Sequence, residues 1–220
     1  MIRNAKKYRD IFGNAEIIIF MRNQIDKYAS NYSHFIKEGC TCTIDEFLFP
    51  KGFNNGPYGG KKHYYDRLFD IYKEVFGKEH VHGYLFEEFI NKPKVFIKDF
   101  AEKFNLDVGL NKINYHPTNQ RLSLTGIKVK RFSNHFTRKS TYNMNNTEYL
   151  KKYHFHIAFW YEISYYLIKQ LQNMHIFCHR SSYEEILGKK NVKRLENFFK
   201  DSNKRLIKNH GFKIIAKYNY

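Results

Sequence analysis

Apolar positions follow two kinds of pattern along the first part of the chain. Glu16–Met21 holds a short continuous apolar run rich in β-branched residues, which predicts a buried strand of a parallel sheet. Val81–Phe86 predicts a second strand. Gln24–Lys37 and Lys62–Phe76 place apolar residues three and four positions apart, as helices do. Strands that alternate with helices indicate an α/β fold with a parallel sheet flanked by helices.

The later part of the chain favours helices. Lys94–Phe104 repeats the helical spacing with aromatic side chains. Residues 105–147 are predicted to be mostly irregular. Two further helices are predicted over Tyr149–Gln172 and Val192–Lys208. The C-terminal half is therefore expected to be rich in helix.

Composition narrows the class of protein. A chain of 220 residues with 42% hydrophobic residues is too apolar for a disordered polymer and predicts a single domain over residues 1–220. No apolar run reaches the roughly 18 residues that span a bilayer, so we expect no membrane span. Three cysteines without zinc-like spacing predict reduced thiols, and we expect a cytoplasmic protein.

The net charge of +17 is concentrated in the second half of the chain. Residues 1–110 hold 17 bases and 15 acids, whereas residues 111–220 hold 21 bases and 6 acids. The segment 108–147 contains no acid at all and seven bases. This distribution favours an anionic partner. A solvated lysine-rich surface is the alternative, and the role of 108–147 stays open.

One strand end has the pattern of an anion site. Arg22 directly follows the first strand, and the helix over Gln24–Lys37 begins two residues later. In open α/β sheets, ligands bind at the carboxyl ends of strands. A guanidinium beside a helix N-terminus suits a phosphate, and Ser30 adds a hydroxyl further along the helix. The alternative is that Arg22 and Ser30 are ordinary surface residues.

Five segments in order resemble a known family. The segment "IIIFMRNQIDKYASNYSHFIKEG" resembles the 3′-phosphate-binding segment of sulfotransferases, in particular the bacterial carbohydrate type. "TIDEFL", the run from "YYDRLFDIYKEVFG" to "FEEFINKPKVFIKDF", and "RLENFFKDSNKRL" with Asn203 and Leu206 fit the same family. The resemblance implies a fold like that of P-loop nucleotide-binding proteins.

The resemblance also implies a donor and a reaction. The sulfate donor would be 3′-phosphoadenosine 5′-phosphosulfate, and Arg22 and Ser30 would match the residues that hold its 3′-phosphate. The reaction would transfer a sulfuryl group to an acceptor hydroxyl, usually on a carbohydrate. The expected partners are an adenine nucleotide bisphosphate and a carbohydrate acceptor, with no specific nucleic acid.

The family's 5′-phosphosulfate loop is not found in this sequence. Members carry that loop on a strand well upstream of the arginine, yet only 21 residues precede Arg22 here. Gly56–Lys62 is glycine-rich but lacks the spacing of a Walker loop. We therefore expect a domain incomplete at its N-terminus, with catalytic residues unknown and weak or no activity alone. A non-catalytic remnant is the alternative.

Other candidate residues have a structural and a functional interpretation. Glu87 and Glu88 follow the second strand and favour a structural role. Arg121, Arg138 and Lys139 lie in the acid-free segment and are candidates to complete the phosphate site. The histidine spacings match no metal motif, so no metal is predicted. A basic polyanion- or nucleic-acid-binding protein remains the alternative function, although the sequence contains no recognisable nucleic-acid-binding motif.

Overall fold

The computed structural model describes residues 1–51, 56–115, 121–135, 163, 166, 181–218 and 220. The helix predicted over Tyr149–Gln172 thus lies outside the described residues except at Ile163 and Tyr166. The described elements are α1 (Ile2–Phe12), β1 (Ile17–Met21), α2 (Gln24–Lys37), α3 (Ile44–Leu48), η1 (Gly60–His63), α4 (Tyr65–Phe76), β2 (Val81–Leu85), α5 (Phe86–Asn91), α6 (Pro93–Lys103), η2 (Leu110–Lys112), α7 (Leu124–Asn134), α9 (Tyr183–Leu187), α10 (Lys189–His210) and η5 (Lys213–Tyr218).

The chain divides into two compact units. The first comprises Met1–Gln24, Gly59–Thr118 and Glu196–Tyr220, and the second comprises Ile25–Tyr58 and Asn119–Leu195. Each unit is thus made of segments far apart in the sequence. The single domain expected over residues 1–220 stays a prediction.

The first unit is built around a parallel pair of strands. β1 pairs with β2 in a register that sets Ile17 against Val81 and Met21 against Leu85. The predicted α/β class and the parallel sheet flanked by helices are therefore confirmed. The described sheet has two strands, and the finer prediction of a P-loop-like sulfotransferase fold remains a proposal.

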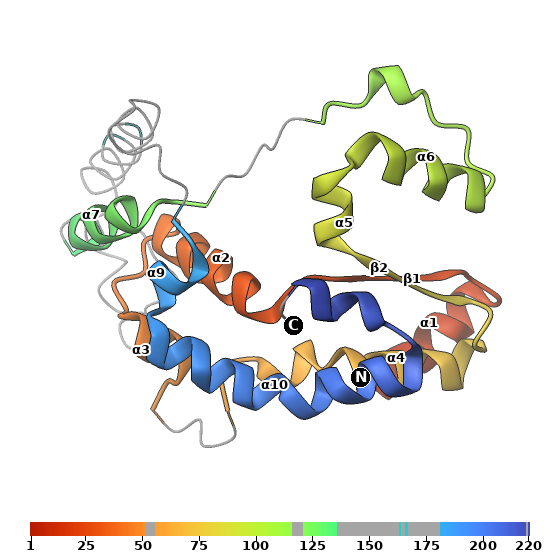
Figure 1. Ribbon diagram of the computed structural model, residues 1–220, viewed down its shortest axis with the longest axis horizontal. Coiled ribbons are helices and arrows are strands. Elements are labelled where there is room, and N and C mark those ends of the chain that lie inside the picture. The colour runs from red at the N-terminus through yellow and green to blue at the C-terminus, as the bar shows by residue number, and fades with distance from the viewer. Residues whose placement is uncertain (52–55, 116–120, 136–162, 164–165, 167–180, 219) are drawn as a thin grey trace. The chain divides into compact units, whose positions relative to one another are not determined.

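Alternate residues of the two strands cover opposite faces of the sheet, as the two-residue period of a strand requires. Ile19, Met21 and Leu85 face the main core, where Phe69 of α4 and Leu206 of α10 are buried. The other face packs rings against α6. Figure 1 shows β1 and β2 side by side, with α5 and α6 over one face and α4 below the other.

Aromatic side chains pack α6 against the sheet. Phe20 of β1 lies 5.7 Å from Tyr84 of β2, between ring centroids, and 5.7 Å from Phe96 of α6. Phe100 adds an edge contact to Tyr84 at 5.3 Å. Such ring pairs add to the stabilisation that comes from burial alone.

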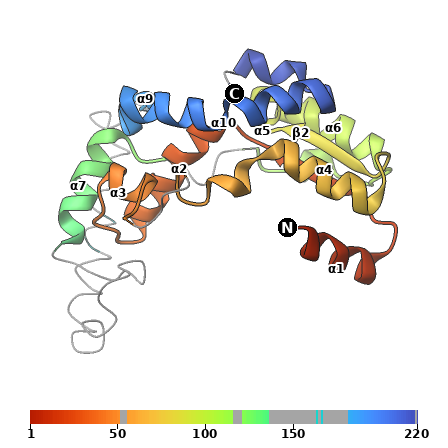
Figure 2. The same ribbon diagram turned by 90° about the horizontal axis from the view of Figure 1, so that it is seen from below.

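The N-terminal helix α1 was not expected from the sequence. It packs along α4, as Figure 2 shows, and buries Ala5 completely. The guanidinium of Arg9 lies over the ring of Phe76, 5.7 Å from its centroid. Arg3, Lys6 and Lys7 are exposed on this helix, whereas Arg9 is half-buried.

The described elements of the second unit are helices. Phe47 of α3 contacts the rings of Tyr32 and Phe35 of α2, and the Asn134 amide of α7 donates to the Ile36 and Cys40 carbonyls. The buried apolar residues of α2, α3, α7 and α9 are Ile25, Tyr28, Ala29, Tyr32, Ile36, Phe47, Leu48, Ile127, Ile186 and Leu187. Helix α7 falls inside the segment 105–147 that was expected to be mostly irregular. That prediction is wrong for α7, which begins at the N-cap Ser123, whose hydroxyl accepts the Gly126 N–H.

The structure differs from the cysteine prediction at one pair. Cys40 and Cys42, expected as reduced thiols, form a disulfide across one intervening residue. The chain between α2 and α3 brings their Cα atoms within 5.6 Å, inside the usual span of a disulfide. Tyr32 donates its hydroxyl to the Cys42 carbonyl and holds the same turn.

Candidate functional site

The predicted strand–arginine–helix unit is present in the structure. β1 ends at Met21, and α2 begins at Gln24, so Arg22 and Asn23 form the whole connection. The hydroxyl of Tyr65 accepts the Arg22 N–H at 3.1 Å and donates to the Arg22 carbonyl at 3.0 Å. This pair of bonds fixes the backbone on which the Arg22 side chain stands.

The Tyr65 hydroxyl is buried, and this burial decides its protonation. Tyr65 is 3% exposed, and burial raises the pKa of its hydroxyl to about 12. The hydroxyl therefore stays protonated at neutral pH and can donate to the Arg22 carbonyl. Tyr65 is a structural support of the strand end.

Arg22 lies where the carboxyl ends of both strands meet. Its half-buried side chain places the guanidinium carbon 4.9 Å from the ring centroid of Phe86. Phe86 is the first residue of α5, directly after β2. The carboxyl ends of parallel strands share one edge, so residues 64 positions apart in sequence contact each other there. A guanidinium stacked on an aromatic face keeps N–H groups in its plane as donors.

A carboxylate occupies the start of α2. The Asn23 N–H donates to Glu87 Oε1 at 2.7 Å, and the Tyr220 hydroxyl donates to Glu87 Oε2 at 2.9 Å. Burial raises the pKa of the Tyr220 hydroxyl, and the charge of Glu87 adds to this effect. Asn23 also donates its side-chain amide to the Tyr218 carbonyl at 2.9 Å. Glu87 thus joins the C-terminal segment to the strand end, in line with the structural role favoured for it.

The first residue of α2 contacts the closing helix. Gln24 is 1% exposed, and its side-chain amide donates to Asn203 Oδ1 of α10 at 2.8 Å. Leu206, one turn further along α10, is fully buried in the core of the first unit. Asn203 and Leu206, quoted for the family resemblance, therefore have structural contacts in this chain.

Ser30 and Arg22 fall in different units. Ser30 is half-buried within α2 and belongs to the second unit, whereas Arg22 belongs to the first. The structure therefore gives the contacts of Arg22 within the first unit and those of Ser30 within the second. Their joint role at a 3′-phosphate stays a prediction.

Arg121 has a structural partner in the second unit. Its Nη1 lies 2.7 Å from Asp26 Oδ1, and its Nη2 donates to the Ser181 carbonyl at 2.7 Å. The side chain is only 8% exposed. Its two outer nitrogens are thus used within the fold, and nothing places Arg121 at a phosphate. Arg138 and Lys139, the other candidates from this segment, lie outside the described residues.

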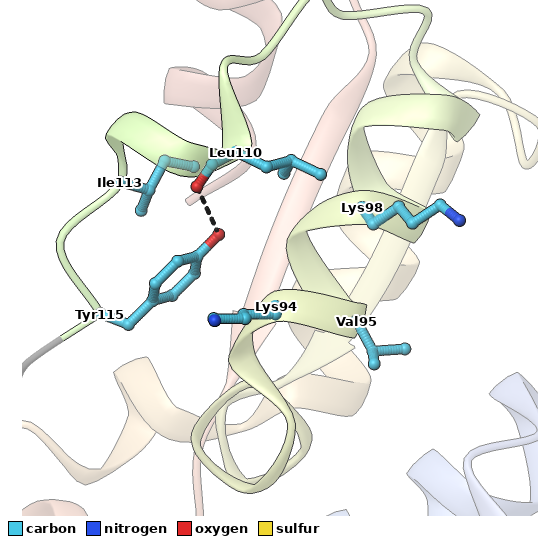
Figure 3. Close-up of a pocket in the computed structure, with 6 residues that line it drawn as sticks. All are labelled: Lys94, Val95, Lys98, Leu110, Ile113 and Tyr115. Carbon is cyan, nitrogen blue, oxygen red and sulfur yellow. Dashed lines mark hydrogen bonds between the residues drawn. The ribbon is translucent and has the colours of Figure 1, made fainter.

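A separate cavity of about 440 Å³ lies between α6 and η2. Lys94, Val95 and Lys98 of α6 line one side, and Leu110, Ile113 and Tyr115 line the other. Figure 3 shows the Lys94 ammonium directed toward Tyr115, 5.9 Å from the ring centroid, and the Lys98 ammonium directed away. None of these residues belongs to the strand-end site.

The described residues contain no cluster of three or more His, Cys, Asp and Glu side chains arranged to hold a metal ion. None of their helices is long and apolar enough to cross a membrane. The prediction that no metal is used stays a prediction.

Comparisons of the chain with protein-family models, curated proteins and solved structures found no match. The sulfotransferase resemblance therefore depends on the residues quoted for it. The sequence predicted the position of Arg22 at a strand end, because the strand pattern ends there, and its role at a phosphate stays a prediction. Tyr65 and Tyr220 were not predicted, because a tyrosine that supports a turn has no local sequence signal.

Proposed function

We propose that the chain is a sulfotransferase-like protein that binds 3′-phosphoadenosine 5′-phosphosulfate or its bisphosphate product, with Arg22 holding the 3′-phosphate. One observation carries the proposal: Arg22 stands between the carboxyl end of a parallel strand and the first turn of α2. A guanidinium there offers two parallel N–H donors to a phosphate, and the helix start adds partial positive charge.

The second part of the proposal concerns Ser30 and the acceptor. The family resemblance pairs the Ser30 hydroxyl with the same phosphate and makes a carbohydrate hydroxyl the acceptor. In the transfer, the acceptor oxygen bonds to sulfur, the bond from sulfur to the 5′-phosphate oxygen breaks, and the acceptor loses its proton to a base. No residue of this chain is assigned as that base. A binding protein without turnover, working in the cytoplasm, is the more limited form of the proposal.

Nucleic-acid or other polyanion binding is a second candidate, because the charge of the second half favours it. The described bases of the acid-free segment are Lys112, Arg121, Lys128, Lys130 and Arg131. Lys130 is 1% exposed, and the Arg121 side chain is bonded to Asp26. Two of these five bases are thus inside the fold. This weakens the case for a continuous basic surface.

Calorimetric titration with adenosine 3′,5′-bisphosphate tests the proposal. We expect saturable binding that weakens about tenfold or more in Arg22→Ala, because a charge-assisted pair to phosphate is lost. Arg67→Ala is the matched control, since Arg67 is exposed and also stacks on a ring, that of Tyr64 at 5.2 Å. Equal affinity of wild type and Arg22→Ala contradicts the proposed site.

Salt dependence separates the two candidate functions. A non-specific polyanion binder loses affinity steeply as salt rises and binds DNA in preference to a single nucleotide. The proposed nucleotide site retains its preference for the bisphosphate over adenosine when salt is raised. Tight DNA binding that Arg22→Ala leaves unchanged, together with no binding of the bisphosphate, supports the second candidate instead.

A further inference from the structure

The disulfide between Cys40 and Cys42 closes a very short loop in the turn between α2 and α3. Only Thr41 stands between the two cysteines. A disulfide stabilises a fold mainly by restricting the unfolded chain, and this contribution grows with the length of the closed loop. The bond therefore adds little to the stability of the second unit. A pair of this kind is better suited to reversible chemistry than to joining distant segments.

Hydrogen bonds that do not involve sulfur hold the turn in place. The Cys40 N–H donates to the Phe35 carbonyl at 2.9 Å, and the Tyr32 hydroxyl donates to the Cys42 carbonyl at 3.0 Å. The side-chain amide of Asn134 in α7 donates to the Cys40 carbonyl at 2.9 Å. Because none of these bonds depends on the disulfide, we expect the two thiols of the reduced protein to stay close enough to rejoin.

The two cysteines differ in their access to solvent and in their contacts. Cys40 is 4% exposed, whereas Cys42 is half-buried, so a dissolved thiol reaches Cys42 more readily. The backbone N–H of Cys42 donates to Cys40 Sγ, with 3.3 Å between nitrogen and sulfur. A donor in that position stabilises negative charge on Cys40 Sγ. The geometry thus favours attack at Cys42 and departure of Cys40 as a thiolate.

We propose that Cys40 and Cys42 form a reversible thiol–disulfide site that exchanges with small thiols such as glutathione. A glutathione thiolate forms a bond to Cys42 Sγ, the bond between the two protein sulfurs breaks, and Cys40 leaves as a thiolate that takes a proton from water. A second glutathione thiolate then attacks the glutathione sulfur bonded to Cys42, which leaves and is protonated in turn. The protein gains two electrons and two protons, and two glutathione molecules become one disulfide. The same steps in reverse oxidise the protein.

Exchange with glutathione tests the site in the full chain. Reduced wild-type protein is mixed with glutathione disulfide at neutral pH, free thiols are blocked with iodoacetamide at set times, and peptides are quantified by mass spectrometry. We expect the Cys40–Cys42 disulfide to form without a lasting adduct, because Cys40 displaces glutathione from Cys42. An excess of reduced glutathione should then return both residues to thiols. A lasting adduct on this pair, or a disulfide that excess glutathione leaves intact, overturns the proposal.

Two single variants test the roles of the two sulfurs. In Cys40→Ser no neighbouring thiol displaces glutathione, so we expect the adduct at Cys42 to accumulate. In the matched variant Cys42→Ser, we expect an adduct to form at Cys40 about tenfold more slowly or less, because thiol exchange depends on access to the sulfur. Cys178, the third cysteine of the chain, is quantified in each protein as the internal reference. Equal adduct rates in the two folded variants overturn the assignment of Cys42 as the attacked residue, and the wild-type experiment decides the proposal where a variant fails to fold.

Discussion

At the scale of single residues, the strand end combines opposite charges. Arg22 is the cation expected to hold a phosphate, while the Glu87 carboxylate accepts the Asn23 N–H that precedes α2. A carboxylate and a phosphate compete for the same donors and repel each other. Glu87 should therefore oppose anion binding in the free protein.

The variant Glu87→Gln tests this competition. It removes the charge but keeps an oxygen that can accept the Asn23 N–H. We expect its affinity for adenosine 3′,5′-bisphosphate to rise about fivefold, as for a partly screened charge pair. Calorimetry measures the effect, and Glu88→Gln is the control one residue away. An affinity that falls in Glu87→Gln alone would show that the carboxylate supports the site instead.

The sequence predicts some of these residues and not others. Arg22 was predicted because a strand ends beside it. Arg121 was a candidate to complete the phosphate site, because nothing local in the sequence shows that Asp26, 95 positions away, is its partner. Lys73 Nζ lies 3.0 Å from His210 Nδ1, a contact that was not predicted for the same reason, since it depends on how α4 packs against α10. Long-range contacts of polar side chains have no period that a sequence pattern can reveal.

At the scale of elements, one glycine sets how closely the sheet packs against its neighbours. A Cβ added to Gly83 of β2 would overlap the rings of Phe69 and Phe212. These two rings lie 4.9 Å apart between centroids, on the core side of the sheet. The absent side chain lets α4 and the segment after α10 approach the strand.

The variant Gly83→Ala should destabilise the protein. Two rings must move to admit one methyl group, and overpacking of this kind costs about 1–3 kcal/mol in the free energy of unfolding. Urea denaturation followed by circular dichroism measures the change. Gly109→Ala is the control, because an added Cβ there meets only the Lys112 side chain at ordinary contact distances. Equal midpoints for the two variants would show that the rings yield freely.

Two histidines share one carboxylate at the start of the strands. Glu16 Oε1 lies 2.8 Å from His80 Nδ1, and Glu16 Oε2 contacts His82 Nε2. The hydrogen bonds from His80 and then His82 lower the pKa of Glu16 from its ordinary value of 4.5. A lowered folded-state pKa gives stability above pH 4.5 that is lost as the pH falls through the folded-state value.

The lowered pKa of Glu16 predicts how the stability of the variant Glu16→Gln changes with pH, relative to wild type. Above pH 4.5 we expect a lower midpoint of thermal unfolding for the variant than for wild type, because wild type keeps a charged Glu16 carboxylate that contacts both histidines. The difference should shrink as the pH is lowered and Glu16 of the wild type is protonated. Glu79→Gln is the control, since Glu79 is 72% exposed and lies 3.8 Å from His80. A midpoint difference that is constant at all pH values contradicts the lowered pKa of Glu16.

Helices and strands were predicted best where one buried face gives the apolar residues a regular spacing in the sequence. β1, α2, α4 and α6 match the expected segments within a few residues, because each buries one continuous face. Helices α1 and α7 were missed, since their apolar positions are few and their stability depends on packing. β2 was expected to include Phe86, but α5 begins there.

At the scale of the whole molecule, the net charge of +17 favours a polyanion only if its bases form an exposed surface. Two bases of the acid-free segment lie inside the second unit, while Arg22 lies in the first unit, in the nearly neutral half of the sequence. The excess of bases is the ground for proposing an anionic partner. Within that proposal, the strand end favours a small phosphorylated molecule, and the family resemblance adds the adenosine part.

The central claim is that Arg22 contacts the 3′-phosphate of the nucleotide. The most direct test titrates wild type and Arg22→Ala with adenosine 3′,5′-bisphosphate and with adenosine 5′-monophosphate, which lacks that group. We predict that the substitution weakens binding of the bisphosphate about tenfold or more and leaves binding of the monophosphate nearly unchanged. Equal losses for both ligands, or no loss for either, would contradict the claim.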